Sequence, residues 1–453
     1  MNIQMMASLL WRLRQLRQHE YWTREQLQQH QTQSLQLIRK YAYTHSPFYQ
    51  RFHQGLTNAP LHELPVLTKG LMMENFDEMV TDRAVLLEDI RTHMKTLQGD
   101  ERYLGKYWVN ATSGSTGHPG VFLFNRSEWT TAITSFARGQ EWGGLKVDVR
   151  HHRKMAVISS TTPLHMSFRV GVTVQSPWVS TLRLAAAEPL PTIVQKLNEW
   201  QPEILIAYAS MARILAEEQH AGRLQIKPAV VFTSSEVLTD ETRRRVEQAW
   251  GKILFNEYAA TESGGLAAEC DHHNGLHLFE DLVIFEVVDE HYQPVPPGVY
   301  GDKLLITVLF NRTQPLIRYE LSDSVRLAAD LCPSKRPFML IDGIQGRVED
   351  TLYFPAVSGG EIAVHPNVFH PVMDTVPASG WQVLQDADSL NILLSGINAE
   401  FKDEVLIEAL QKALGAQGVI IPSIELKHVA AIPKTASGKA PLVKSNRADT
   451  ALQ

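Results

Sequence analysis

Short apolar segments alternate with helix-compatible segments between residues 154 and 255, and this alternation sets the tightest limit on the fold. The apolar runs, typical of buried strands, occupy residues 155–158, 204–207, 230–232 and 252–255. The helical segments are expected at residues 190–200, 212–219 and 240–250. Thr239 stands before the last of them, and its hydroxyl suits a helix N-cap. Strands that alternate with helices form parallel sheets buried on both faces, so the sequence predicts an α/β fold.

The chain changes character on either side of this region. Residues 1–50 have helical spacing and predict two or three helices. An antiparallel subdomain is expected from strands that Pro/Gly turns separate, at residues 283–288, 304–308 and 325–327. Residues 343–350 read as a linker, and the chain beyond them mixes strands with a helix, at residues 381–384, 390–394, 404–414 and 424–426. We therefore expect a large domain of parallel sheets, flanking helices and this antiparallel subdomain over residues 1–345, and a small mobile α+β domain over residues 346–453.

Composition excludes several classes of protein. The 453 residues are 44% hydrophobic, enough to bury a large core, and the net charge of −6 predicts no nucleic-acid surface. Two cysteines, Cys270 and Cys332, fit a reducing compartment, and we expect a cytoplasmic protein. Arginines interrupt the apolar start, which predicts no signal peptide. No run of about 18 apolar residues is present, so no membrane span is expected.

A stretch rich in glycine and hydroxyl groups, residues 112–120, lies between two short apolar runs that predict strands, residues 107–109 and 121–124. Glycines let a backbone approach an anion closely, and serine and threonine hydroxyls add donors for phosphate oxygens. The stretch lacks the Gly-Lys-Ser/Thr triplet of a Walker P-loop. Taken alone, it is compatible with a polyanion site and equally with a solvated hairpin turn.

Polar clusters follow three of the predicted parallel strands. They are Tyr208, Ala209 and Ser210, then Ser234, Ser235 and Glu236, and finally the residues 256–262, with Asn256, Tyr258, Thr261 and Glu262. Ligands of parallel sheets bind at the carboxyl ends of the strands. The sequence therefore predicts one site to which all three clusters contribute.

Five motifs occur in an order that resembles the adenylate-forming superfamily, which includes acyl-CoA ligases, adenylation domains and luciferases. They are the glycine-rich loop 112–119, residues 258–262, Arg318 with Asp323, residues 346–350, and Ser437-Gly438-Lys439. Three further segments, residues 46–49, 64–69 and 315–319, look most like the phenylacetate-CoA ligase and coenzyme F390 synthetase branch. The resemblance covers nearly the whole chain. Each motif is weak alone, and their shared order makes the resemblance specific.

The resemblance implies an ATP site. The phosphates would lie in the glycine-rich loop, on Thr112, Ser113, Gly114, Ser115, Thr116 and Gly117. Adenine would contact Tyr258, Asn256 and the loop of Ser234, Ser235 and Glu236, while Asp323 would accept the ribose hydroxyls and Arg347 would reach the ribose or a phosphate. A carboxylate suits a cis-diol because it has two acceptor oxygens.

The resemblance also assigns the chemistry. Thr261 would hold the α-phosphate, and Glu262 would bind Mg²⁺, a hard cation that prefers oxygen ligands. Lys439, on a mobile loop, would neutralise charge as a carboxylate attacks the α-phosphorus. Its alternative is a solvated lysine of the tail, which the preceding Ser-Gly turn argues against. Glu349 matches the hinge about which the small domain turns.

The chain departs from the family pattern at three places. His118 is the only cation of the phosphate loop, and the usual Arg-Thr-Gly/Arg-Asp has become Glu320-Leu321-Ser322-Asp323. Cys270, His277 and Cys332 resemble part of a zinc site found in some members of the branch, with Ser334 where a further cysteine would stand. Structural zinc takes four ligands, so we expect buried thiols and no bound zinc here, although His272 and His273 are candidate replacements.

The acyl pocket is expected beside Tyr208, Ala209, Ser210 and His165, although a histidine that only stabilises its loop is an equal alternative. The implied reaction converts ATP and a carboxylic acid, expected to be aromatic, into acyl-AMP, and then transfers the acyl group to a thiol, expected to be CoA. Transfer to an amine or a carrier protein is the first alternative. A nucleotide-binding sensor without turnover is the second. The oligomeric state stays open, with a homodimer among the alternatives.

Overall fold

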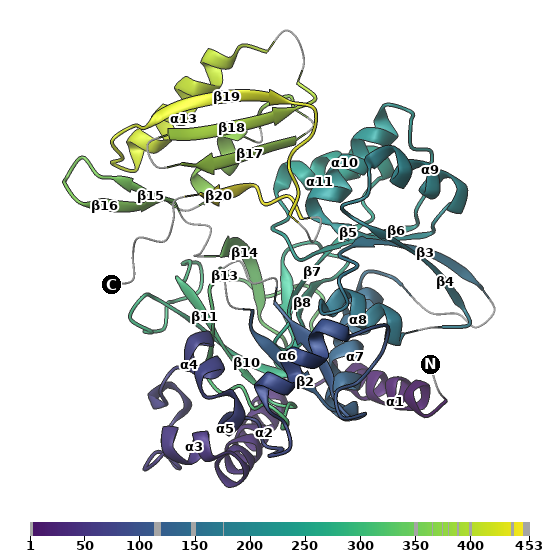
Figure 1. The fold of residues 1–453 in the computed structure, drawn as a ribbon, viewed down its shortest axis with the longest axis vertical. Helices are drawn as coiled ribbons and strands as arrows, with labels where there is room; N and C mark the ends of the chain where they lie inside the picture. The colour runs from purple at the N-terminus through teal and green to yellow at the C-terminus, as the bar shows by residue number, and fades with distance from the viewer. Residues whose placement is uncertain are drawn as a thin grey trace.

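A computed structural model shows the architecture of the chain (Figure 1). It describes residues 3–112, 119–145, 151–174, 176–347, 352–364, 366–373, 375–378, 380–386, 389–397, 401–435 and 439–446. In these ranges a mixed nine-stranded sheet is covered by helices, and a small α+β domain lies beside it. The α/β fold is thus confirmed. None of the described helices is long and apolar enough to cross a membrane.

The central sheet has a parallel half and an antiparallel half. The parallel half consists of β4 (Val179–Ala185), β3 (Arg153–Ser159), β5 (Ile204–Tyr208), β6 (Val230–Ser234) and β7 (Leu254–Ala260), in that order. The antiparallel half continues through β8 (Gly264–Glu269), β9 (Leu276–Leu278), β14 (Leu340–Arg347) and β13 (Asp323–Leu327). The alternation in the sequence therefore predicted the parallel half correctly, except for β4.

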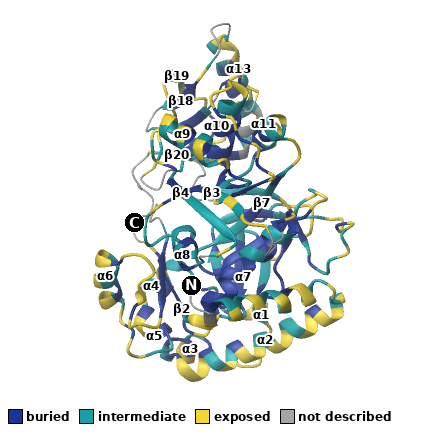
Figure 2. Ribbon diagram, turned by 90° about the vertical axis from the view of Figure 1, so that its right-hand side faces the viewer, coloured by how far each residue is buried: buried dark blue, intermediate teal, exposed yellow. Residues whose placement is uncertain are grey.

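The helices of the large domain are α1 (Ile3–His19), α2 (Arg24–His45), α3 (Pro47–Phe52), η1 (Leu61–Glu63), α4 (Lys69–Glu74), α5 (Phe76–Met79), α6 (Leu87–Thr96), α7 (Arg126–Trp142), α8 (Met166–Thr173), α9 (Leu190–Trp200), α10 (Ala209–His220) and α11 (Asp240–Trp250). The helices predicted within residues 1–50 and at residues 190–200, 212–219 and 240–250 are present, whereas α5, α6, α7 and α8 were not predicted from the sequence. Thr239 caps α11 as predicted, because its hydroxyl accepts a hydrogen bond from the Thr242 amide at 3.1 Å. Figure 2 shows that α7 is largely buried, whereas α1 and α2 expose their outer faces.

Two local predictions were wrong. Residues 343–347 are no linker, because they belong to β14 and pair with β13, where Asp323 lies opposite Arg347. Gly343 and Gly346 led to the linker prediction, because glycine is typical of loops and the pairing with β13 cannot be recognised from neighbouring residues. Residues 325–327 lie in β13 at the edge of the central sheet, while the separate antiparallel sheet consists of β10 (Val283–Val288), β11 (Lys303–Val308) and β12 (Tyr319–Leu321).

The small domain has its own core. Its elements are β15 (Leu352–Pro355), β16 (Glu361–Val364), η3 (Pro366–Val368), α12 (His370–Met373), β17 (Gly380–Gln385), β18 (Ser389–Ser395), α13 (Asp403–Ala416), β19 (Ser423–Val429) and β20 (Val443–Ser445). Trp381, Ile392 and Leu410 are among the buried side chains that pack together there. A separate apolar cluster is what a domain of its own requires, and the division of the chain after residue 345 stays a prediction.

One acid is buried in the interface between α7 and the sheet. Glu257 of β7 lies against Gly139 of α7, and its Oε1 atom has no hydrogen-bond partner. Burial raises the pKa of Glu257 to about 8. The folded chain therefore retains a proton that the unfolded chain releases near pH 4.5, and the folded state loses stability as the pH rises from there to 8.

We expect Glu257→Gln to flatten this pH dependence. A buried neutral amide does not titrate, whereas each pH unit between 4.5 and 8 costs the wild type about 1.4 kcal/mol at most. Urea unfolding from pH 5 to pH 8 measures the effect, with Glu290→Gln at an exposed turn as the control. If the free energy of unfolding changed equally with pH in the wild type and in Glu257→Gln, Glu257 would be ionised in the folded chain.

Candidate functional site

The glycine-rich stretch joins two antiparallel strands, β1 (Trp108–Ala111) and β2 (Val121–Phe124). Thr112 closes its base, because its amide donates to the Gly120 carbonyl at 3.0 Å and its hydroxyl accepts from the Gly120 amide at 2.9 Å. The remaining predicted phosphate contacts, Ser113, Gly114, Ser115, Thr116 and Gly117, lie outside the described residues, as does His118. The strand–loop–strand arrangement predicted from the sequence is confirmed on both flanks.

Tyr258 and Asp323, both predicted to bind the nucleoside, are in direct contact. The Tyr258 hydroxyl donates to Asp323 Oδ2 at 2.6 Å across 65 positions of sequence. Asp323 begins β13 directly opposite Arg347 of β14, so the backbone brings three predicted residues together. Asn256 and Tyr258 lie within β7, which extends five residues beyond the predicted end at 255 because it pairs with β8. The backbone N–H of Asn256 donates a hydrogen bond to Glu269 Oε2 at 2.9 Å, which fixes the strand at this residue.

Thr261 and Glu262 follow β7 at its carboxyl end. Glu262 is 7% exposed, and the Tyr319 hydroxyl lies 3.5 Å from its Oε1 atom. A carboxylate at the end of a strand provides the oxygen chemistry that Mg²⁺ prefers, so the residues present fit the predicted cation.

The predicted acyl-side residues form a hydrogen-bonded group. The Tyr208 hydroxyl accepts from the Ser160 amide at 2.8 Å, and Ser160 Oγ lies 2.7 Å from His165 Nδ1. Burial raises the pKa of Tyr208 to about 12, which keeps its phenol neutral. Burial, with a smaller effect of the Lys439 charge, lowers the pKa of His165. The lowered pKa favours the neutral imidazole of His165, and no motif in the sequence indicates Ser160, its partner.

Lys439 lies at this group although it belongs to the small domain. Its Nζ atom is 5.6 Å from the centre of the Tyr208 ring. Glu236 joins the same place: its carboxylate accepts from the Ser210 amide at 2.8 Å and from the Ala440 amide at 3.3 Å. Burial raises the pKa of Glu236, and the bonds from Ser210 and the charge of Lys439 act against that rise. The structure thus brings together Lys439, Tyr208, Ser210 and Glu236.

Further contacts fix the small domain against the large one. Arg213 of α10 and Arg245 of α11 each donate to the Ala378 carbonyl at 2.9 Å. Lys434 donates to the Ala186 carbonyl at 2.7 Å. These residues are far apart in the sequence and carry no motif, which is why sequence reasoning missed them. The predicted hinge, Glu349, lies outside the described residues.

Cys270, His277 and Cys332 come together in a buried cluster. Cys270 Sγ lies 3.4 Å from His277 Nε2 and 3.6 Å from Cys332 Sγ. Ser334 Oγ lies 3.4 Å from His277 Nε2, and Asn274 Oδ1 lies 3.3 Å from Cys332 Sγ. His272 approaches Cys270 at 3.7 Å, whereas His273 faces Glu269. Burial raises the pKa of Cys270 to about 11 and lowers that of His277 to about 4.

We expect Ser334→Cys to create a zinc site here. Two thiols and an imidazole are three ligands of a tetrahedral set, and a third thiolate would complete it. The variant is expected to retain about one zinc ion per chain, and the unchanged chain much less, when both are purified with zinc, dialysed and analysed by mass spectrometry. Stoichiometric zinc in the unchanged chain would contradict the expectation that three ligands are insufficient.

The comparisons with known proteins agree with this geometry. The AMP-binding enzyme family matches residues 107–306. The phenylacetate-coenzyme A ligase of Thermus thermophilus is 26% identical over 368 residues, which cover 78% of this chain and 76% of that protein. The Escherichia coli phenylacetate-coenzyme A ligase is 25% identical, with 74% of each chain covered. The comparisons therefore show an AMP-binding enzyme domain over residues 107–306 and similarity to phenylacetate-coenzyme A ligases along most of the chain.

Solved structures share the fold of this chain. A 2-hydroxyisobutyryl-CoA ligase in the postadenylation state, in complex with 2-HIB-AMP, superposes with a TM-score of 0.71 at 20% identity, and the match covers 91% of this chain and 88% of the other. The same ligase with CoA in its thioester-forming state gives a TM-score of 0.60, with 94% and 91% covered. The present chain therefore superposes better on the first of these two structures.

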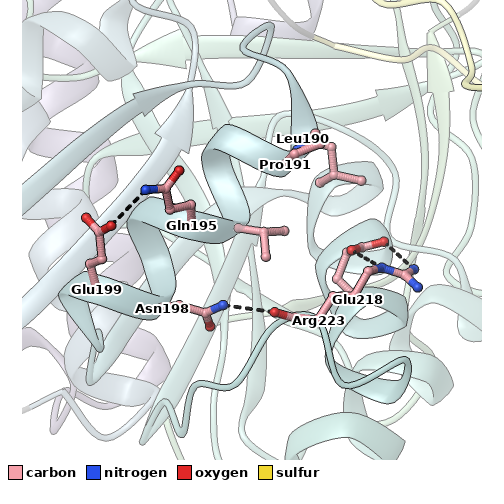
Figure 3. Close-up of a pocket in the computed structure, with 8 residues that line it drawn as sticks. Leu190, Pro191, Gln195, Asn198, Glu199, Glu218 and Arg223 are labelled. Atoms are coloured by element: carbon pink, nitrogen blue, oxygen red, sulfur yellow. Dashed lines mark hydrogen bonds and ion pairs between the residues drawn. The ribbon is translucent and has the colours of Figure 1, made fainter.

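A hollow between α9 and α10 is distinct from this site (Figure 3). Leu190, Pro191 and Val194 form its apolar side, and Glu218 pairs with Arg223 at its rim. It contains none of the residues predicted to bind nucleotide or acid, so we assign it no part in the reaction.

Proposed function

We propose that this ligase activates a carboxylic acid as acyl-AMP and then transfers the acyl group to CoA. The observation that carries the proposal is a set of two contacts, Tyr258 with Asp323 and Lys439 with Tyr208, at the adjacent carboxyl ends of β5, β6 and β7. The first is suited to a nucleoside, since a flat ring and a carboxylate can contact adenine and a ribose diol. The second places an ammonium group beside the proposed acid pocket.

In the proposed first step, a substrate carboxylate oxygen attacks the α-phosphorus, the bond to the β-phosphate oxygen breaks, and pyrophosphate leaves. Lys439 would neutralise the charge that two approaching anions create, and Thr261 would hold an α-phosphate oxygen. Glu262 would hold Mg²⁺, which when bound offsets the phosphate charge. The phosphate loop, Thr112 to Gly117, would supply backbone and hydroxyl donors, and the loop of Ser234, Ser235 and Glu236 would flank the adenine.

In the proposed second step, the sulfur of CoA attacks the acyl carbon, the bond to the phosphate oxygen of AMP breaks, and the thiol proton passes to solvent. His165, neutral beside Ser160, would border the acid pocket with Tyr208, Ala209 and Ser210. We propose an aromatic acid, because the phenylacetate-coenzyme A ligases named above are similar to this chain along most of its length.

Acid-dependent exchange of pyrophosphate into ATP tests the proposal. Phenylacetate, benzoate and 2-hydroxyisobutyrate form the acid panel, each with and without CoA. We expect exchange with an aromatic acid and AMP release only when CoA is added. Exchange without consumption of CoA would favour an amine or carrier-protein acceptor. Absence of exchange with any acid would favour a nucleotide sensor.

A further inference from the structure

One carboxylate connects the two domains next to Lys439. Glu236 lies in the loop after β6, and its two oxygens accept from the amides of Ser210 and Ala440. We call this pair of hydrogen bonds the Glu236 bridge. Ser210 belongs to the same domain as Glu236, whereas Ala440 belongs to the small domain, so only the bond from Ala440 requires the two domains to be in contact.

The large-domain end of the Glu236 bridge is a helix N-terminus. Ser210 is the second residue of α10. Tyr208 occupies the N-cap position, and its side chain makes no capping hydrogen bond to that helix. The first amides of a helix have no partner within it and favour an anion. Glu236 therefore supplies a cap to α10 that is present whether or not the small domain is in place.

On the small domain, the partner of the Glu236 bridge is the peptide group between Lys439 and Ala440. The carbonyl of Lys439 accepts from the Thr435 amide at 2.8 Å, and the amide of the same peptide group, on Ala440, donates to Glu236. The peptide is thus fixed on both sides, once within its own loop and once to the large domain. A fixed backbone limits the positions that the Lys439 ammonium can reach, and the ammonium lies beside Tyr208.

We propose that Glu236 is a positioning residue that holds Lys439 in place for acyl-AMP formation and has no part in the transfer of the acyl group to the thiol. This rests on the proposed two-step function. The bond to Ala440 is long and spans two domains, so it is a contact that can open without unfolding either one.

Separate measurement of the two half-reactions distinguishes a positioning role of Glu236 from a purely structural one. Glu236→Ala removes both acceptors, and Glu236→Gln keeps one accepting oxygen. Two rates are measured: acyl-AMP formation, and thioester formation from supplied acyl-AMP. We expect the ratio of the first rate to the second to fall about tenfold in Glu236→Ala and less in Glu236→Gln. Glu218→Ala is the matched control, because Glu218 is also on the large domain at α10 but pairs with Arg223 away from the small domain.

Tryptic cleavage after Lys439 tests the Glu236 bridge without any substrate. We expect cleavage about tenfold faster in Glu236→Ala than in the wild type and in Glu218→Ala, because cleavage follows the population of the open loop. An equal fall of both half-reactions, or an unchanged cleavage rate, would overturn the proposal. A wild type without exchange would refute the two-step function, and the cleavage rates would still decide whether the Glu236 bridge exists.

Discussion

Replacing Lys439 with alanine is expected to slow acyl-AMP formation about 100-fold, equivalent to about 3 kcal/mol of transition-state stabilisation. The reason is electrostatic: a substrate carboxylate and a triphosphate repel each other, and in the proposed site the Lys439 ammonium, beside Tyr208 and His165, would lie between them. Acid-dependent pyrophosphate exchange at saturating ATP measures the effect. The fall should appear in kcat rather than in the KM for ATP, because the charge acts mainly in the transition state.

Lys434→Ala is the matched control for Lys439→Ala. Lys434 is on the same loop, and its ammonium donates to the Ala186 carbonyl, so its loss weakens a contact between the domains without removing the charge at Tyr208. We expect a loss of about tenfold or less. If the two variants lost activity equally, the loop would matter only for holding the domains together, and Lys439 would have no electrostatic role.

The order of elements was readable from the sequence because it depends on local pattern. Residues 155–158, 204–207 and 230–232 are apolar runs bounded by helices, and they became β3, β5 and β6. The linker prediction for residues 343–347 failed because β14 depends on β13, a partner that local spacing does not reveal. Glycines at 343 and 346 indicate a break when only neighbouring residues are considered.

In the candidate site, too, motif residues could be predicted from the sequence, whereas contacts between distant residues could not. Tyr258, Asp323 and Lys439 were identified through the resemblance of their motifs, and the structure places Tyr258 on Asp323. The Glu236 bridge, the contact of Ser160 with His165 and the arginine contacts at Ala378 join residues that have no motif in common. Such pairs depend on how the chain closes on itself, and a single sequence contains no direct signal of them.

Asp281→Ala is expected to lower the free energy of unfolding by about 3–5 kcal/mol. Asp281 and Arg138 are fully buried and joined by three hydrogen bonds of 2.8–3.0 Å, and His19 of α1 lies 2.7 Å from the same carboxylate. Arg138 also lies over the Phe279 ring at 4.0 Å. Removal of the carboxylate leaves a buried guanidinium without its counter-charge, in the interface that connects α1 and α7 to the sheet.

The contribution of Asp281 to the free energy of unfolding is expected to depend on pH. Burial alone would raise the pKa of Asp281, but the charge of Arg138 and the hydrogen bond with His19 together hold that pKa well below its ordinary value. The stabilising contribution is therefore present above about pH 4, where the unfolded chain has lost the proton, and disappears as the pH falls through the folded value. The difference between the wild type and Asp281→Ala in urea unfolding should be largest near pH 7 and should shrink below pH 4.

Two controls separate an uncompensated charge from lost packing. Replacing both partners, as Arg138→Met with Asp281→Leu, should recover most of the stability lost in Asp281→Ala, because apolar groups of similar size need no counter-charge. Glu78→Ala removes an exposed ion pair with Arg51 and should cost about 1 kcal/mol or less. If the double variant were as unstable as Asp281→Ala, the cost would come from the shape of the interface, and the ion pair would be needed for its geometry rather than for its charge.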